Sequence, residues 1–459
     1  MDDEEYSFLR REGLVIDLFA GGGGASIGIE KALGRPIDIA LNHDPYALAL
    51  HGVNHPRTQH LLQSIEDANP TEVVAGRPVF HLHASPSCTQ FSRSRRALPA
   101  EKQLRDHAWK VLEWIKQTRP LIFTCENVPE FRTWGPLKPS GFPDRDRAGE
   151  YWSSWVEQIR ELGYDIEDRD INAADLGAHT ARERLMVIAR RDDRAIGWPV
   201  EDHGPGKPNP WNGAAEHIDW EVAAPSIFTR KKPLAEATME RIRKGVEKFV
   251  VNDPDPFIAP EQARISHGLD DDSRVAAFLA QNHTGLAGRP ATAPLSTICS
   301  KAAGQSLVTI SFMDIARRNS TGVDLRNPAN TICTSGQHHA EVRISAFLAG
   351  YYRDGGGQLL DVRKPIGTIS TRDRFALVEI KGAPHVIVDI GYRFLTVDEL
   401  WNLSGFDTRK LKRDIIVNGR PLSATRQKKM IGNAVVPLFM QRILEANLHD
   451  EDIEYAKAA

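Results

Sequence analysis

One cysteine stands where it could act as a nucleophile. Cys88 lies in the polar segment ASPSCTQFS (84–92), which follows an apolar, strand-like run at 79–84. A structural cysteine normally sits among apolar neighbours, whereas a thiolate on a polar loop can attack an electrophilic carbon. A free thiol has a pKa of about 8.5, so ionisation at neutral pH needs a cationic or dipolar neighbour. A single cysteine is more often structural, and Cys125, in an apolar run, fits that alternative.

Three charged side chains further along could assist a nucleophile. Glu126 follows the strand-like LIFTC (121–125), and we expect it just past that strand, where a parallel sheet presents its active-site groups. Arg182 and Arg184 alternate at the period of a strand, which predicts that both side chains point to one face. A carboxylate beside a helix cap and a solvated edge strand are the alternative interpretations.

A glycine-rich turn near the N-terminus could hold a nucleotide-like cofactor. The apolar run at 14–19 leads into AGGGG (20–24) and then into a helix-like segment that Gly34 should end. Backbone N–H groups in such a turn, and the helix N-terminus behind it, can approach a ligand closely. The turn is not a GxGxxG pattern and could serve chain reversal alone. Asn42, after the strand-like run at 37–41, could bind a ribose hydroxyl or cap a turn.

Alternating strand-like and helix-like segments must position these groups. Up to about residue 191 the alternation predicts parallel βαβ units, and hence an α/β fold with a doubly wound mixed sheet. From residue 192 proline and glycine become more frequent, and a Pro-led turn before a β-branched segment recurs at 293–300, 327–334 and 364–371. We therefore expect a catalytic and cofactor-binding domain at 1–191, a domain of repeated β units at 192–391, and a segment at 392–459 that returns to the first domain.

Composition limits the classes of function. The 459 residues are 41% hydrophobic and 26% charged, as in folded soluble proteins, and the net charge is −3. Nucleic-acid contacts must therefore come from local basic patches, for which 230–232, 241–244 and 317–318 are candidates and solvated faces the alternative. The four cysteines form no CxxC pair, so we expect no metal. Without an apolar run of 18 residues or a signal peptide, we expect a cytosolic protein away from membranes.

The order of these motifs is more specific than any one of them. DLFAGGGG (17–24), NHD (42–44), SPSCTQFS (85–92), ENV (126–128), RER (182–184) and GNAVVP (432–437) follow one another, with a long insert before the last. This series resembles the DNA cytosine-5 methyltransferase family over about residues 13–191 and 392–445. The WGPL at 134–137 is similar to bacterial and phage members. The resemblance implies a methyltransferase-type sheet that uses S-adenosyl-L-methionine, and a β-rich target-recognition domain in the insert.

The resemblance also implies a reaction. Cys88 would add to C6 of a cytosine flipped out of duplex DNA, so that C5 can accept the methyl group. A protonated Glu126 would contact N3, and Arg184 would hold O2, where negative charge develops. The implied catalytic residues are Cys88, Glu126, Asn127, Arg182 and Arg184.

Two further sets of residues follow from the same resemblance. The implied cofactor-binding residues, with Phe19 against the adenine, are Phe19, Ala20, Gly21, Gly22, Gly23, Gly24, Asn42, His43, Ser64, Ile65, Pro86, Asn433 and Val435. The implied DNA-binding residues are Ser92, Arg93, Arg95 and Arg96. The chain departs from the family pattern at Asn42, Ser64, Ser87, Thr89 and Thr180, where Glu, Asp, Pro, Gln and Gln are usual. We expect these changes to tune activity rather than abolish it.

Other functions stay open at this point. An RNA cytosine-5 methyltransferase would carry the same catalytic motifs, and the departures above also fit a non-catalytic protein that binds DNA or senses its modification. A nicotinamide site in the glycine turn is a weaker alternative, since it leaves the cysteine loop unexplained. For the methyltransferase we expect a monomer acting on double-stranded DNA; the sequence leaves open a separately encoded restriction endonuclease, the DNA sequence recognised, and a bacterial or phage source.

Overall fold

The computed structural model describes residues 1–86, 102–271, 273–281, 288–298, 304–314, 376–380 and 383–448. They belong to two compact units. Unit 1 comprises Met1–Asn212, Ser296–Ala302 and Leu400–Ala459, and unit 2 comprises Gly213–Leu295 and Ala303–Glu399. Cys88, the candidate DNA contacts Ser92, Arg93, Arg95 and Arg96, and the repeats at 327–334 and 364–371 lie outside the described residues.

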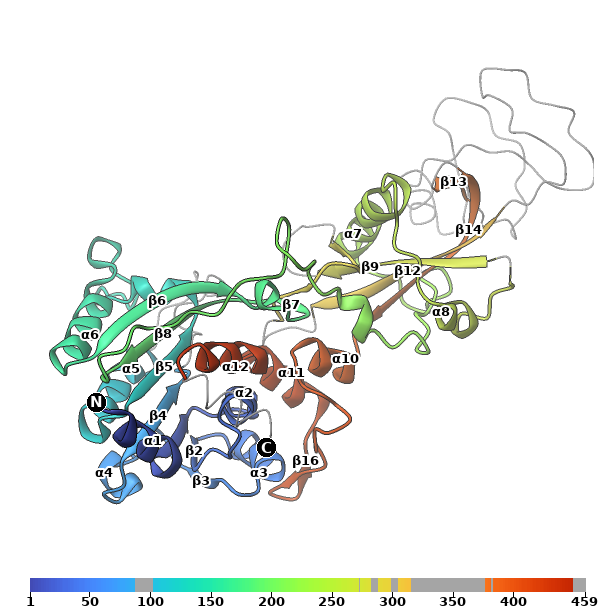
Figure 1. The fold of residues 1–459 in the computed structure, drawn as a ribbon. Helices are drawn as coiled ribbons and strands as arrows, with labels where there is room; N and C mark the ends of the chain where they lie inside the picture. Colours follow the sequence, from blue (N-terminus) through green and yellow to red (C-terminus); the bar gives the residue numbers. More distant parts are fainter. Residues whose placement is uncertain are drawn as a thin grey trace, which may run out of the picture. The chain divides into compact units, whose positions relative to one another are not determined.

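Unit 1 is built on a seven-stranded mixed sheet with the order β3-β2-β1-β4-β5-β8-β6 (Figure 1). Its strands are β1 (Leu14–Leu18), β2 (Ile39–Asn42), β3 (Gln59–Leu62), β4 (Val79–Ala84), β5 (Ile122–Asn127), β6 (Asp165–Asn172) and β8 (Glu183–Arg190). The first five strands of this order, from β3 to β5, are parallel to one another. Strand β8 runs antiparallel to both of its neighbours, β5 and β6. The predicted doubly wound α/β sheet is confirmed.

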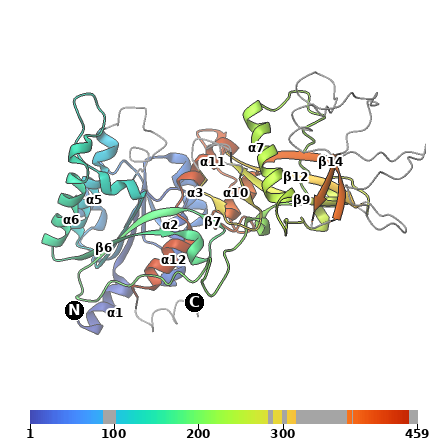
Figure 2. The same ribbon diagram turned by 90° about the horizontal axis from the view of Figure 1, so that it is seen from above.

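Helices cover both faces of this sheet, as Figure 2 shows. One face packs on α5 (Lys102–Thr118) and α6 (Glu150–Glu161), and the other on α1 (Asp3–Glu12), α2 (Gly24–Leu33) and α12 (Pro437–Glu445). The remaining helices that begin in this unit are α3 (Pro45–Asn54), α4 (Pro70–Val74) and α11 (Ala424–Asn433). All residues of β1, β2, β4 and β5 are buried, as expected for parallel strands between two helix layers.

Close backbone contact ties the C-terminal segment to the glycine-rich helix. A Cβ atom on Gly28 of α2 would lie 2.2 Å from the Pro437 carbonyl oxygen of α12, so only glycine lets the helices approach this closely. The predicted end of α2 is confirmed, because Gly34 adopts φ 66° and donates its N–H to the Glu30 carbonyl.

Unit 2 contains a five-stranded antiparallel sheet with the order β10-β9-β12-β14-β13. Its strands are β9 (Ser273–Gln281), β10 (Arg289–Pro290), β12 (Gln305–Asp314), β13 (Ala376–Ile380) and β14 (Ala383–Phe394). Helix α7 (Glu236–Val246) packs on one face, where a Cβ on Gly245 would lie 2.1 Å from the Phe278 ring. This is the separate β-rich unit that the sequence predicts within the insert.

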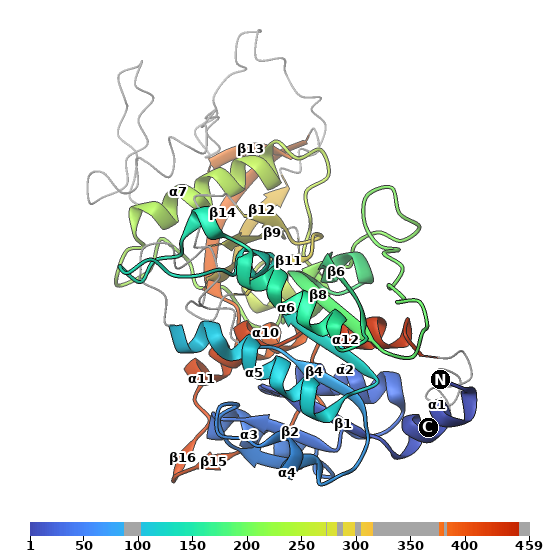
Figure 3. The ribbon, with the colours of Figure 1, turned by 90° about the vertical axis from the view of Figure 1, so that its left-hand side faces the viewer.

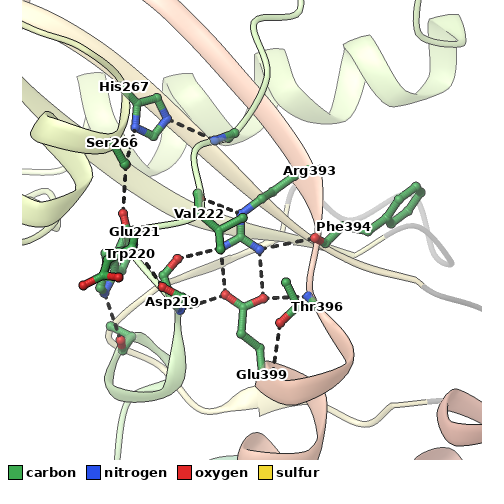
Figure 4. A network of polar contacts seen from close by, with 12 residues as sticks. Asp219, Trp220, Glu221, Val222, Ser266, His267, Arg393, Phe394, Thr396 and Glu399 are labelled. Atoms are coloured by element: carbon green, nitrogen blue, oxygen red, sulfur yellow. Dashed lines mark hydrogen bonds and ion pairs between the residues drawn. The ribbon is translucent and has the colours of Figure 1, made fainter. Parts of the chain in front are cut away.

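A buried ion pair fixes the chain where β14 ends and α10 (Val397–Leu403) begins (Figure 4). Arg393 donates from both terminal nitrogens to the two carboxylate oxygens of Glu399, at 2.8 and 2.7 Å. Arg393 also donates to the carbonyls of Asp219 and Val222. Glu399 in turn accepts the backbone N–H groups of Asp219 and Thr396. Each charge is therefore satisfied by several partners, as a buried pair requires.

Candidate active site

The carboxyl ends of β1, β4 and β5 lie side by side, and each carries a predicted motif. The glycine turn follows β1, Ser85 and Pro86 follow β4, and Glu126 and Asn127 end β5. The Ser85 N–H donates to the Leu18 carbonyl at 3.4 Å, which joins two of these ends directly. The topology thus gathers motifs that are more than a hundred residues apart in the sequence, from Gly24 to Glu126.

Glu126 lies inside β5, so the prediction that it sits just past the strand is wrong. The reason is the antiparallel neighbour β8: its residues Leu185 and Met186 pair with Asn127 and Glu126 and extend β5 to its last polar residues. The carboxylate is therefore held by a rigid strand rather than by a loop.

Glu126 and Arg184 form a buried ion pair, with Arg184 Nε 2.8 Å from Glu126 Oε1 and side chains 10% and 9% exposed. The two atoms are not aligned for a hydrogen bond, and neither makes one within the described residues. Arg184 Nε and Glu126 Oε1 are therefore buried and charged, and both can still form a hydrogen bond. The edge-strand alternative for Arg184 is wrong, because β8 lies between β5 and β6.

Asn127 connects this pair to the cysteine loop. Its Nδ2 donates to the Pro86 carbonyl at 3.2 Å, and its Oδ1 accepts the Val128 N–H at 2.9 Å. Pro86 is two residues before Cys88 in the chain. The segment that leads to the candidate nucleophile is therefore fixed to the end of the strand that carries Glu126.

Arg182 has a different partner from Arg184. It lies just before β8, is 5% exposed, and its Nη1 donates to the Gly432 carbonyl at 3.1 Å. Gly432 opens the GNAVVP motif, so this bond ties the last motif in the sequence to the RER motif. Thr180, one of the departures from the resembled motif pattern, is buried.

The glycine turn has a backbone that few other residues would permit. Gly21 and Gly23 have φ values of 53° and 93°, and even Phe19 is left-handed at 65°. A Cβ on Gly24, the first residue of α2, would lie 2.1 Å from the Val435 carbonyl oxygen. The turn therefore brings backbone and the N-terminus of α2 to the carboxyl edge of the sheet, which fits a cofactor with a charged amino-acid end.

His107 lies beside Phe19, a position that the sequence does not predict. Its ring on α5 lies 5.5 Å from the ring of Phe19, and its Nε2 is 3.6 Å from Glu66 Oε1. Phe19 itself is only partly buried. Nothing in the sequence distinguishes His107 from other residues on the buried face of an amphipathic helix.

The remaining predicted cofactor residues differ in how accessible they are. Asn42 accepts the Asp44 N–H at 2.8 Å, so the turn-capping alternative describes what its side chain does. His43 and Asn433 are exposed, Ser64 is half-buried, and the Ile65 side chain belongs to the core. The ligand-binding roles of these residues stay predictions.

A chain of polar side chains, buried except at half-buried His60, runs beneath the glycine turn. Asp17 accepts a hydrogen bond of 2.5 Å from the Ser26 hydroxyl, which also contacts His51 Nε2 at 2.9 Å. His51 Nδ1 lies 2.8 Å from His60 Nε2. Burial raises the pKa of Asp17 to about 7, although the Ser26 hydrogen bond opposes the shift. Burial also lowers the pKa of His51 well below its ordinary value.

Other buried titratable groups behave as structural residues. The His81 and His83 rings both contact Thr124 Oγ1 at 2.9 Å, and burial lowers the pKa of each to about 3, so both are neutral. Burial raises the pKa of the free thiol of Cys125, which fits the structural alternative. In the described part of the chain, no cluster of His, Cys, Asp or Glu could hold a metal ion.

A family model described as C-5 cytosine-specific DNA methylase matches residues 14–449. The chain belongs to this family. Among curated proteins, the Type II methyltransferase M1.HphI of Haemophilus parahaemolyticus is 28% identical over 41% of this chain and 48% of its own length. M.XorII of Xanthomonas oryzae is 30% identical over 38% of this chain and 40% of its own, and M.AgeI of Thalassovita gelatinovora 30% over 42% and 43%. The matched part of the chain thus spans less than half the length of these relatives.

Among the described residues, no helix is both long and apolar enough to cross a membrane.

Proposed function

We propose that the protein transfers a methyl group from S-adenosyl-L-methionine to C5 of a cytosine flipped out of duplex DNA. The observation that carries the proposal is the hydrogen bond from Asn127 to the Pro86 carbonyl. It fixes the chain two residues before Cys88 to the strand end that holds the Glu126–Arg184 pair. Membership of the cytosine-5 methylase family supports the same assignment.

The chemistry requires a nucleophile and polar groups that stabilise the negative charge on the cytosine ring. Cytosine C5 is too electron-poor to attack a methyl donor, so Cys88 Sγ first bonds to C6 and an electron pair moves towards N3 and O2. Glu126 then hydrogen-bonds or protonates N3, and Arg184 holds O2. The cofactor supplies the electrophilic methyl group. After C5 has taken it, a base removes the C5 proton, and the bond from Sγ to C6 breaks to regenerate the thiolate.

The cofactor role rests on the glycine turn and its surroundings. Phe19, against His107, would bind the adenine, and the backbone of Ala20 to Gly24 would face the amino-acid end. Further contacts with the cofactor would come from Asn42, His43, Ser64 and Asn433. The C-terminal motif is held against the turn through Arg182 and Val435. Unit 2 would read the DNA sequence, with Ser92, Arg93, Arg95 and Arg96 on the DNA backbone. We propose a monomer acting in the cytoplasm, with or without a separately encoded restriction endonuclease.

Methyl transfer from labelled cofactor to duplex DNA and to tRNA tests the proposal. We expect label in DNA, and bisulfite sequencing of that DNA should place it at one recurring cytosine context. Cys88→Ser should lose this activity by several orders of magnitude, while Cys125→Ser, which changes the buried thiol, should keep a measurable rate. Label in tRNA alone would replace DNA with RNA as the substrate. DNA binding by wild-type protein with no transfer to either substrate would favour the modification sensor.

A further inference from the structure

Residues 407–429, the basic hairpin segment, carry a charge opposite to that of the whole protein. They hold eight cations against the two carboxylates of Asp407 and Asp414, a formal charge of +6 in a chain of net charge −3. The cations are Arg409, Lys410, Lys412, Arg413, Arg420, Arg426, Lys428 and Lys429. None of the motifs described above uses this segment.

The segment has a defined fold. Strands β15 (Ile416–Val417) and β16 (Arg420–Pro421) pair antiparallel, and the turn residues Asn418 and Gly419 both have positive φ, at 51° and 71°. Such an Asn-Gly turn is typical of a tight hairpin. Figures 1 and 3 show the hairpin beside α3. Its position is therefore set by packing within unit 1.

Specific contacts fix the segment to α3. The side chain of Asn54 donates to the Lys412 carbonyl and accepts the Lys412 N–H, both at 2.9 Å. The Tyr46 hydroxyl donates to the Val417 carbonyl, and the Arg426 guanidinium lies 4.0 Å from the centre of the Tyr46 ring. Because the backbone is held in this way, the cationic side chains are presented from a fixed frame.

Part of this positive charge faces solvent without a neutralising partner. Arg409, Lys410, Lys412 and Arg420 are exposed, and Arg409 pairs with Asp407 at 2.9 Å. The other three make no ion pair within the described residues. The basic run at 241–244 is different, because there Arg243 binds both Glu240 and Glu247. We therefore interpret that run as a neutralised helix face, which the hairpin is not.

We propose that the basic hairpin segment binds the phosphate backbone of duplex DNA outside the cytosine that is modified. Like charges crowded on one surface repel one another, and a polyanion relieves that repulsion. The segment continues through α11 to Gly432, whose carbonyl accepts a hydrogen bond from Arg182. Helix α11 therefore connects the segment to the candidate active site. The proposal rests on the proposed function in taking DNA as the partner.

Salt dependence of DNA binding tests the proposal. In wild-type protein, the logarithm of the binding constant for a 40-base-pair duplex should fall linearly with the logarithm of salt concentration, by about 0.9 per phosphate contact. The triple variant Lys410→Gln, Lys412→Gln, Arg420→Gln should reduce that slope by about 2 to 3. Between 50 and 200 mM salt, the affinity of the variant for DNA should therefore fall by a factor that is roughly 20-fold to 60-fold smaller than in wild type.

A control with the same change in net charge separates a local contact from the general field. The triple variant Lys110→Gln, Lys116→Gln, Arg160→Gln alters α5 and α6 and should leave the slope within error. Equal slopes for wild type and the hairpin variant, or equal losses in both triple variants, would overturn the proposal. Thermal melting checks that both variants are folded, and Arg420→Glu alone should lower the slope in the same direction.

The proposed function is measured separately in the same samples. With saturating duplex at low salt, wild-type protein and the control variant in α5 and α6 should transfer methyl groups at the same rate. Absence of transfer by wild-type protein contradicts the proposed function, yet the slopes still report on the hairpin. Unchanged slopes with normal transfer contradict only the hairpin proposal.

Discussion

Asp17 offers a sharp test of the buried chain beneath the glycine turn. Burial raises the pKa of Asp17 from 3.8 to about 7. Ionisation of this carboxyl group is therefore less favourable in the folded protein than in the unfolded chain. Below pH 3.8 the group is protonated in both states and has no effect on stability. As the pH rises from 3.8 to 7 the unfolded state loses its proton first, so stability falls, by about 4 kcal/mol in total. Above pH 7 this loss is constant.

The variant Asp17→Asn removes the titration and keeps an oxygen that can accept the Ser26 hydroxyl. It should therefore be more stable than wild type at pH 8, and its advantage should shrink by about 2.5 kcal/mol on going to pH 5. Urea unfolding of both proteins at pH 5, 6, 7 and 8 measures the difference. A difference that does not change with pH would contradict the raised pKa of Asp17. In Ser26→Ala the pKa of Asp17 should rise further, so the fall in stability should continue to a higher pH.

Three further predictions follow from other contacts. Glu399→Gln should destabilise unit 2 by about 3 to 5 kcal/mol in urea unfolding, because it leaves the buried Arg393 guanidinium without its charge partner. As a control, Arg409→Gln, which breaks an exposed ion pair, should change stability by less than about 1 kcal/mol. Gly28→Ala should lower stability by about 1 to 3 kcal/mol, since the added Cβ would meet a backbone oxygen, and a stability equal to wild type would contradict the close helix contact. Asn127→Ala should lower kcat by about tenfold or more with little change in KM for the cofactor, because it frees the Pro86 end of the cysteine loop; an unchanged kcat would argue against that tether.

Much of the sheet could be predicted from the sequence, because its strands are apolar runs closed by turn residues. LVIDL and LIFTC show the near-continuous hydrophobicity of parallel strands that are covered on both faces. The position of Glu126 could not be predicted in the same way, since the end of β5 is set by pairing with β8, some sixty residues later. Strand limits that depend on a distant partner are not encoded locally.

The candidate site shows a similar division. The order of the motifs names Glu126 and Arg184, but their ion pair depends on the register of two strands. His107 could not be identified, because a histidine on the buried face of a helix looks like any core residue until Phe19 is placed against it. The chain from Asp17 to His60 was missed for the same reason: its members come from β1, α2, α3 and β3, and no sequence spacing relates them.

Covalent trapping on DNA that contains 5-fluorocytosine tests directly whether Cys88 bonds to the cytosine. Fluorine at C5 cannot leave as a proton does, so a thiolate that has added to C6 stays bonded after methyl transfer. We expect a stable protein–DNA adduct in the presence of S-adenosyl-L-methionine, with peptide mass spectrometry placing the bond on Cys88 and no adduct in Cys88→Ser. Methylation of ordinary DNA without any adduct, or an adduct on a residue other than Cys88, would contradict this expectation.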